Sequence, residues 1–192
     1  RDDGKNPRLQ VVMIIPEYLR HLDSLLGIHS LGCNFRYTGE EAYEYSGSGP
    51  IAELTDPENY NDIYGLQTRR NPDLEQFADW YSTGKKIFPY ENIELTPTIL
   101  KHWYVSDGSL RKGRTEKSYF ASITACNEYE NKDKIYELFS DIGIEPSSMY
   151  TGKENEEKLE INFSKEGTID LSKYMGEPLP GFEYKWPDYM TF

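Results

Sequence analysis

The sequence of 192 residues contains no apolar run near the roughly 18 residues that a membrane span needs. It has two cysteines, Cys33 and Cys126, and no CxxC or His/Cys cluster, so we expect neither a disulfide framework nor a zinc site. No signal peptide is visible, and 16 tyrosines are too many for a disordered chain. These features predict a folded intracellular protein that is neither secreted nor bound to a membrane.

Acidic residues outnumber basic residues in the sequence. There are 21 Lys and Arg against 33 Asp and Glu, a net charge of −12, which by itself argues against a nucleic-acid binder. However, residues 40–62 and 128–170 together carry −14, and the remaining 126 residues carry +2. An anion-binding surface is therefore expected outside those two acidic segments.

The hydrophobic pattern predicts the same order of elements in each half of the chain: strand, helix, strand, strand, helix. In the first half we expect strands at 8–15, 34–38 and 62–69, helices at 16–26 and from 71 to about 84, and a loop at 39–59. In the second half we expect helices at 97–107, 130–142 and 168–175, and strands at 118–126, 147–151 and 158–163. A duplicated unit of this kind usually indicates pseudo-two-fold symmetry.

Two short signatures repeat along with these elements. An Asp-Gly pair occurs at Asp3-Gly4 and again at Asp107-Gly108, where it ends the helix predicted at 97–107. Each half also closes on a lysine shortly before a proline, at Lys86 and at Lys185. Each signature alone is unremarkable, but both occur twice, in step with the duplicated elements.

These residues resemble the LAGLIDADG homing endonucleases. The segment LTPTILKHWYVSDGSL (95–110) is similar to the second motif of that family, and YGLQTRRNPDLEQFADWYSTGKKIFP (64–89) is similar to the segment that precedes it. FEYKWP (182–187) is similar to the closing segment of the family, and RDDG (1–4) resembles the last residues of its first motif.

The resemblance implies an α+β fold. It consists of two pseudo-two-fold related αββαββα repeats that form a saddle of antiparallel sheets, with the first interface helix largely missing. The first repeat would span residues 1–92 and the second residues 93–192.

The resemblance also implies an activity: site-specific hydrolysis of phosphodiester bonds in double-stranded DNA by a monomer, as in intron or intein mobility. Two neighbouring carboxylates repel each other unless a cation lies between them, and Mg²⁺ or another divalent cation prefers such hard oxygen ligands. The expected metal site consists of Asp3, Asp107, Gly4 and Gly108. The expected basic groups near the attacking water are Lys86 and Lys185.

A sheet that lies in the major groove would read bases with arginine and amide side chains. Gln67 and Arg69 have the same parity on one predicted strand, so they could share a face. The candidate DNA-contacting residues are Arg8, Arg36, Gln67, Arg69, Arg70, Arg111, Lys112, Arg114 and Lys117, with Ser122 on the strand at 118–126.

Two alternatives remain open. The chain could be a non-cleaving DNA- or RNA-binding relative on the same scaffold, such as an intron maturase or a regulator. It could also be an acidic interaction module with no nucleic-acid role, which only the net charge supports. Both Asp-Gly pairs and both lysines favour the nuclease.

Overall fold

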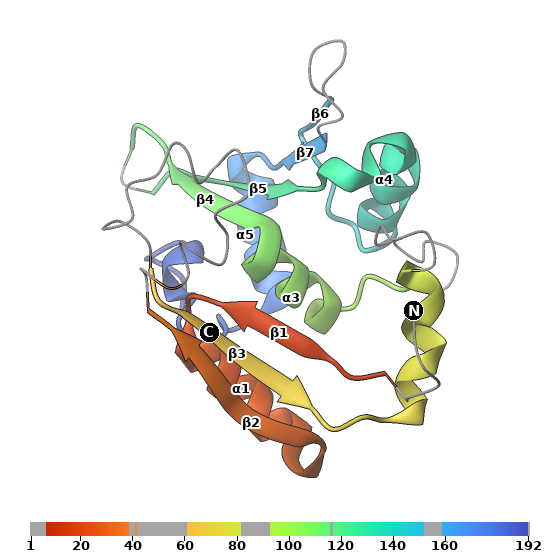
Figure 1. Cartoon of the computed structure of the whole chain (residues 1–192). Coiled ribbons are helices and arrows are strands. Elements are labelled where there is room, and N and C mark those ends of the chain that lie inside the picture. Colours follow the sequence, from red (N-terminus) through yellow and green to blue (C-terminus); the bar gives the residue numbers. More distant parts are fainter. Residues whose placement is uncertain are drawn as a thin grey trace. The chain divides into compact units, whose positions relative to one another are not determined.

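The computed structural model describes residues 7–38, 41, 61–81, 93–115, 117–151 and 159–191. The chain divides into two compact units, Arg1–Asp79 and Trp80–Phe192, each of which has its own antiparallel sheet (Figure 1). Within the described ranges, no helix has the length and apolar character needed to cross a membrane.

In its described residues, the first unit has a three-stranded sheet with helix α1 packed against it. Its strands pair in the order β1-β3-β2, and all pairs are antiparallel. The elements are β1 (Gln10–Met13), α1 (Pro16–Leu26), the 3-10 helix η1 (Gly27–His29), β2 (Ser30–Tyr37), β3 (Ile63–Thr68) and the 3-10 helix η4 (Pro72–Tyr81).

Helix α1 covers one face of this sheet and lies behind it in Figure 1. It begins at Pro16, where the missing N–H costs nothing, and ends at Gly27, whose φ of 50° favours glycine. Leu19 on the helix and Leu66 on β3 are fully buried. Gln67, the next residue along β3, therefore points to the opposite, open face of the sheet.

The second unit is a four-stranded sheet in the order β4-β5-β7-β6. Its elements are α3 (Pro97–Asp107), β4 (Gly108–Lys112), β5 (Tyr119–Thr124), the 3-10 helix η6 (Cys126–Asn131), α4 (Lys132–Asp141), β6 (Ser148–Thr151), β7 (Leu159–Asn162), α5 (Lys165–Met175) and the 3-10 helix η7 (Glu183–Lys185). This is the αββαββα order expected for a repeat.

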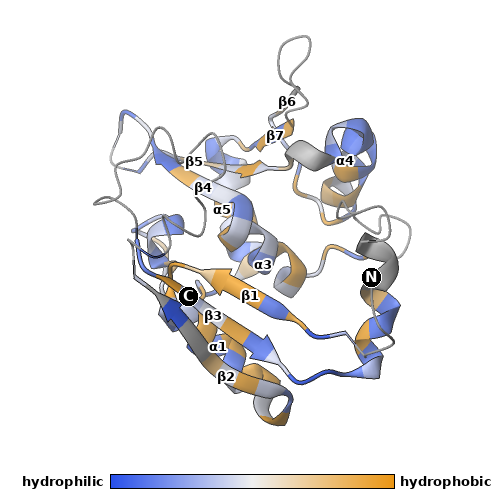
Figure 2. Ribbon diagram, in the orientation of Figure 1, coloured by the Kyte–Doolittle hydropathy of each residue, from blue (hydrophilic) through white to orange (hydrophobic). Residues whose placement is uncertain are grey.

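Helices α3 and α5 contact each other and cover one face of the four-stranded sheet. Leu100 on α3, Ile123 on β5 and Leu171 on α5 are all fully buried. Figure 2 shows hydrophobic segments alternating with polar ones along the strands and helices of both units, as expected where one face of each element is buried. The other face of the sheet remains for contacts outside the core.

The two units share one topology. In the first, β1, α1, β2 and β3 follow one another and pair as β1-β3-β2; in the second, β5, α4, β6 and β7 do the same and pair as β5-β7-β6. The glycines after the two equivalent helices, Gly27 and Gly143, both have positive φ. The predicted order of strand, helix, strand and strand is thus confirmed in each unit, while the pseudo-two-fold symmetry and the repeat boundary at residues 92–93 stay predictions.

Several expected boundaries were wrong. The segment after Asn71 forms a 3-10 helix where an α-helix was expected, β2 begins at Ser30 instead of residue 34, and α5 begins at Lys165 instead of residue 168. Strand β4 was not predicted from the sequence. Most of the expected loop at 39–59 lies outside the described residues.

Candidate functional site

Asp107 is the last residue of α3 and the carboxylate that the helix presents to solvent. Thr96 caps the start of α3, because its hydroxyl accepts a hydrogen bond from the Ile99 N–H at 3.3 Å. Further along the helix, Tyr104 and Val105 are buried and Asp107 is exposed. The core therefore fixes the helix, while its final carboxylate stays accessible.

Gly108 follows Asp107 directly and begins β4, so no loop separates the helix from the strand. A Cβ at Gly108 would lie 2.2 Å from Cδ2 of the Tyr104 ring and 2.4 Å from the Tyr104 carbonyl oxygen. Close packing against Tyr104 thus requires glycine at position 108.

Lys185 lies at the same helix end, where its ammonium binds backbone carbonyls. The side chain is only 9% exposed, and Nζ donates to the carbonyl oxygens of Val105 and Gly108, each at 2.7 Å. Burial lowers the pKa of the ammonium, and the negative charge of Asp107 opposes that shift. The lysine is therefore bound to the end of α3 instead of standing free beside a water molecule.

The hydrogen bond from Lys185 to Gly108 affects one of the metal ligands expected from the sequence. The Gly108 carbonyl accepts from an ammonium group, and a metal ion at the same oxygen would be repelled by that charge. Among the described residues, no group of three or more His, Cys, Asp or Glu side chains could hold a metal ion. Of the two carboxylates expected at a metal site, only Asp107 lies in the described part of the chain.

The other expected catalytic residues, Asp3, Gly4 and Lys86, lie outside the described residues. Asp3 precedes β1 by seven positions, whereas Asp107 precedes β5, the equivalent strand, by twelve. The difference of five positions matches the length of β4. Asp3 therefore stays a prediction, and its spacing to the equivalent strand differs from that of Asp107.

A row of small polar side chains crosses the open face of the four-stranded sheet. Ser109 on β4 stands opposite Ser122 on β5, which stands opposite Asn162 on β7, which stands opposite Ser148 on β6. The hydroxyls of Ser109 and Ser122 are 2.9 Å apart and hydrogen-bonded. Because neighbouring strands lie about 4.8 Å apart, the row spans roughly 14 Å. It begins two residues after Asp107.

Of the four residues in this row, the sequence had indicated only Ser122. The segment LEIN on β7 alternates buried Leu159 and Ile161 with Glu160 and Asn162, and this period of two could have placed Asn162 on an open face. The strand register that aligns the four residues comes only from the structure.

Basic residues flank the row at the β4–β5 hairpin. Arg111 lies on the open face opposite Phe120, with its guanidinium 5.9 Å from the ring centre, and Arg114 and Lys117 are exposed in the turn. Lys112 points to the other face, because successive strand residues alternate. There it forms an exposed ion pair with Asp188 at 3.5 Å.

In the first unit, the open face carries a hydrogen-bonded polar cluster. Arg8 donates to the Gln67 side-chain oxygen at 3.2 Å, and the Gln67 amide donates to Gln10 at 3.3 Å. Gln10 had not been identified from the sequence. Arg69 is exposed, but its Nε donates to the Ile28 carbonyl at 3.2 Å, and Arg70 beside it is exposed as well.

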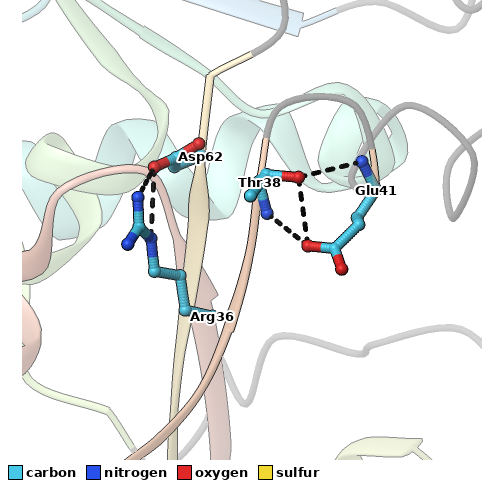
Figure 3. Close-up of polar contacts among 4 residues, drawn as sticks. All are labelled: Arg36, Thr38, Glu41 and Asp62. Carbon is cyan, nitrogen blue, oxygen red and sulfur yellow. Dashed lines mark hydrogen bonds and ion pairs between the residues drawn. The ribbon is translucent and has the colours of Figure 1, made fainter.

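Arg36 is separate from that cluster. It stands opposite Tyr64, on the face of the sheet that carries Leu66, and its guanidinium pairs with the Asp62 carboxylate (Figure 3). The pair raises the pKa of Arg36, chiefly through the hydrogen bond to Asp62. Because an acid already neutralises this arginine, its contribution to binding phosphate is smaller than the sequence alone suggested.

Thr38 and Glu41, which are also drawn in Figure 3, form a capping box. The Glu41 carboxylate accepts from the Thr38 N–H at 2.8 Å, and the Thr38 hydroxyl oxygen accepts from the Glu41 N–H at 3.4 Å. The hydrogen bond from the Thr38 backbone is the main cause of the lowered pKa of Glu41. Glu41 has helical backbone conformation, within the segment 39–59 where a loop was expected.

Comparison with known proteins supports the fold. No family model and no curated protein sequence matches the chain. A solved structure described as the homing endonuclease I-WcaI bound to its DNA recognition sequence matches with a TM-score of 0.69. The match has 14% sequence identity and covers 97% of this chain and 79% of that chain. The chain therefore has a homing endonuclease fold, with mixed helices and antiparallel sheets.

Proposed function

We propose that the chain is a site-specific endonuclease that hydrolyses both strands of duplex DNA with a divalent metal ion. The observation that carries the proposal is the position of Asp107. This exposed carboxylate ends a helix anchored in the core, two residues before the polar row that crosses the open sheet. The solved structure with the similar fold is bound to DNA.

The open faces suit the contacts that duplex DNA offers. The row from Ser109 to Ser148 spans roughly 14 Å, close to the width of about 12 Å of the major groove of B-DNA. Asn162 can bind adenine with two hydrogen bonds, and Arg8 and Gln67 offer the side-chain types that read guanine and adenine. Arg111, Arg114 and Lys117 supply positive charge for the phosphates beside the row.

The donors present fit a magnesium ion. Mg²⁺ needs only one or two carboxylates from a protein and completes its coordination with water and substrate phosphates, so Asp107 suffices for the second unit. We assign the second carboxylate to Asp3 and a basic role to Lys86. When bound, the ion would polarise the scissile phosphate and activate water. Asp107 would hold the ion, and the open face would hold the duplex in register.

A non-cleaving DNA- or RNA-binding protein is the second candidate. The observation in its favour is that Lys185 and the Gly108 carbonyl bind each other, so neither is free for the reaction as expected. Such a protein would bind a duplex as the nuclease does but leave it intact. Binding and cutting must therefore be measured separately.

The test uses a randomised duplex library, because the target sequence is unknown. The chain is incubated with the library in Mg²⁺, and the newly formed DNA ends are sequenced. The proposal predicts ends that share one sequence, and their loss in Asp107→Asn without loss of duplex binding. The matched control is Asp170→Asn, which changes an exposed carboxylate on α5. Duplex binding without any new ends would favour the second candidate, and equal cutting by Asp107→Asn would overturn the role of Asp107.

A further inference from the structure

Lys185 binds the backbone on both sides of Asp107. Its Nζ donates to the carbonyl of Val105, two residues before the aspartate, and to the carbonyl of Gly108, the residue after it. The Val105 carbonyl belongs to the last turn of α3, where carbonyl groups have no partner within the helix. One ammonium group thus bridges the end of the helix and the start of the strand.

The lysine is itself held firmly in place. The Tyr104 hydroxyl on α3 donates to the Lys185 carbonyl at 3.0 Å, so the contact between helix and tail runs in both directions. Trp186, the next residue, packs edge-on against Tyr104 with ring centres 5.5 Å apart, and its indole N–H donates to the Gly176 carbonyl at 3.0 Å. The ammonium therefore approaches α3 from a segment fixed at two further points.

We propose that Lys185 is a positioning residue for Asp107, which fixes the peptide groups around the aspartate so that its carboxylate is held in one place. The inference rests on the proposed function and changes the role of the lysine within it. Two of its three N–H groups bind backbone carbonyls, so the lysine acts through the geometry of α3 and not by contact with the attacked phosphate.

Loss of this positioning should affect the chemical step of cleavage and not duplex binding. Reaction rates depend steeply on the placement of reacting groups, and a shift of about 1 Å can reduce a rate roughly 100-fold. Duplex binding depends instead on the open faces, which Lys185 does not reach because it is bound beneath the end of α3. Removing the ammonium should therefore reduce the cleavage rate and leave duplex affinity nearly unchanged.

The test compares Lys185→Met with Lys173→Met in the full chain. Methionine keeps much of the apolar stem of Lys185 without the charge, and Lys173 is an exposed lysine in the last turn of α5. Three quantities are measured: amide hydrogen exchange at residues 106–109, duplex affinity without metal, and the single-turnover cleavage rate. We expect Lys185→Met to exchange faster at 106–109 and to cut about 100-fold more slowly at unchanged affinity, while Lys173→Met matches the parent. If Lys185→Met does not fold, Lys185→Gln, which has a shorter side chain and an uncharged amide with two N–H donors, replaces it with the same expected direction.

The exchange measurement separates the two proposals. Slower cutting with unchanged exchange at 106–109 would overturn positioning, because the lysine would then act on the reaction directly. Parent-like cutting and exchange would overturn it as well. If the parent binds the duplex but does not cut it, the proposed function fails, while faster exchange in Lys185→Met still supports the anchoring of Asp107.

Discussion

Replacing Gly108 by alanine would put a methyl group where the structure has no space for one. The new carbon would lie 2.2 and 2.6 Å from two atoms of the Tyr104 ring, whereas carbon atoms pack best at about 3.5–4.0 Å. The ring cannot easily move away, because its hydroxyl is bonded to the Lys185 carbonyl and Trp186 packs against it. Relief therefore requires a shift of more than 1 Å at the junction of α3 and β4.

Overpacking of this kind typically costs about 1–3 kcal/mol, and the fixed ring puts Gly108→Ala near the upper end. For a chain of this length, a loss of about 3 kcal/mol lowers Tm by roughly 6–12 °C. The measurement is the free energy of unfolding in urea together with Tm from a thermal scan.

Gly167→Ala is the matched control, since the new methyl group there makes only ordinary van der Waals contacts. The nearest atom to the new methyl group is the Ser164 hydroxyl oxygen at 3.4 Å, and Gly167 lies within α5. Alanine is the better helix former, so this variant should be more stable than the parent by up to about 1 kcal/mol. Equal stability of Gly108→Ala and the parent would refute the claim that packing against Tyr104 requires this glycine.

Other predictions concern stability and binding. Burial raises the pKa of the Tyr18 hydroxyl from 10.0 to about 12. The stability that the neutral hydroxyl contributes is therefore present below pH 10 and is lost as the pH rises toward 12. Tyr18→Phe should flatten that part of the curve of unfolding free energy against pH. Thr168→Val should cost about 1–3 kcal/mol in urea unfolding, because the buried Ala121 N–H loses the hydroxyl that accepts from it at 2.8 Å; a cost near zero would contradict this. Arg111→Ala should weaken duplex binding and reduce the slope of log affinity against log salt by about 1, and an unchanged slope would remove Arg111 from the interface.

Much of the fold follows from residues that start and end helices and that can be recognised in the sequence. Pro16 and the pair Thr96-Pro97 start helices where proline and a capping hydroxyl are expected to do so, and Gly27 ends the first of them. Strand β4 was harder to predict, because Gly108 and Lys112 belong to types depleted in strands and Leu110 is the only large apolar residue in it. Its position depends on pairing with β5.

The candidate site was predictable only where it depends on residues that are adjacent in sequence. Asp107 could be identified because the Asp-Gly pair and the helix before it are adjacent in sequence. The role of Lys185 could not, because it depends on contacts with Val105 and Gly108, which lie about 80 residues away and meet the lysine only after folding. The ion pair of Arg36 likewise depends on Asp62, which precedes the neighbouring strand.

The most direct test of the central claim is the single-turnover rate at which Asp107→Asn cuts a duplex recovered from the library, compared with the parent at saturating Mg²⁺ and equal occupancy of the DNA. The structure places this carboxylate, exposed and anchored, at the end of α3. The account predicts a rate lower by a factor on the order of 100 or more, with binding retained. A rate equal to that of the parent would contradict it.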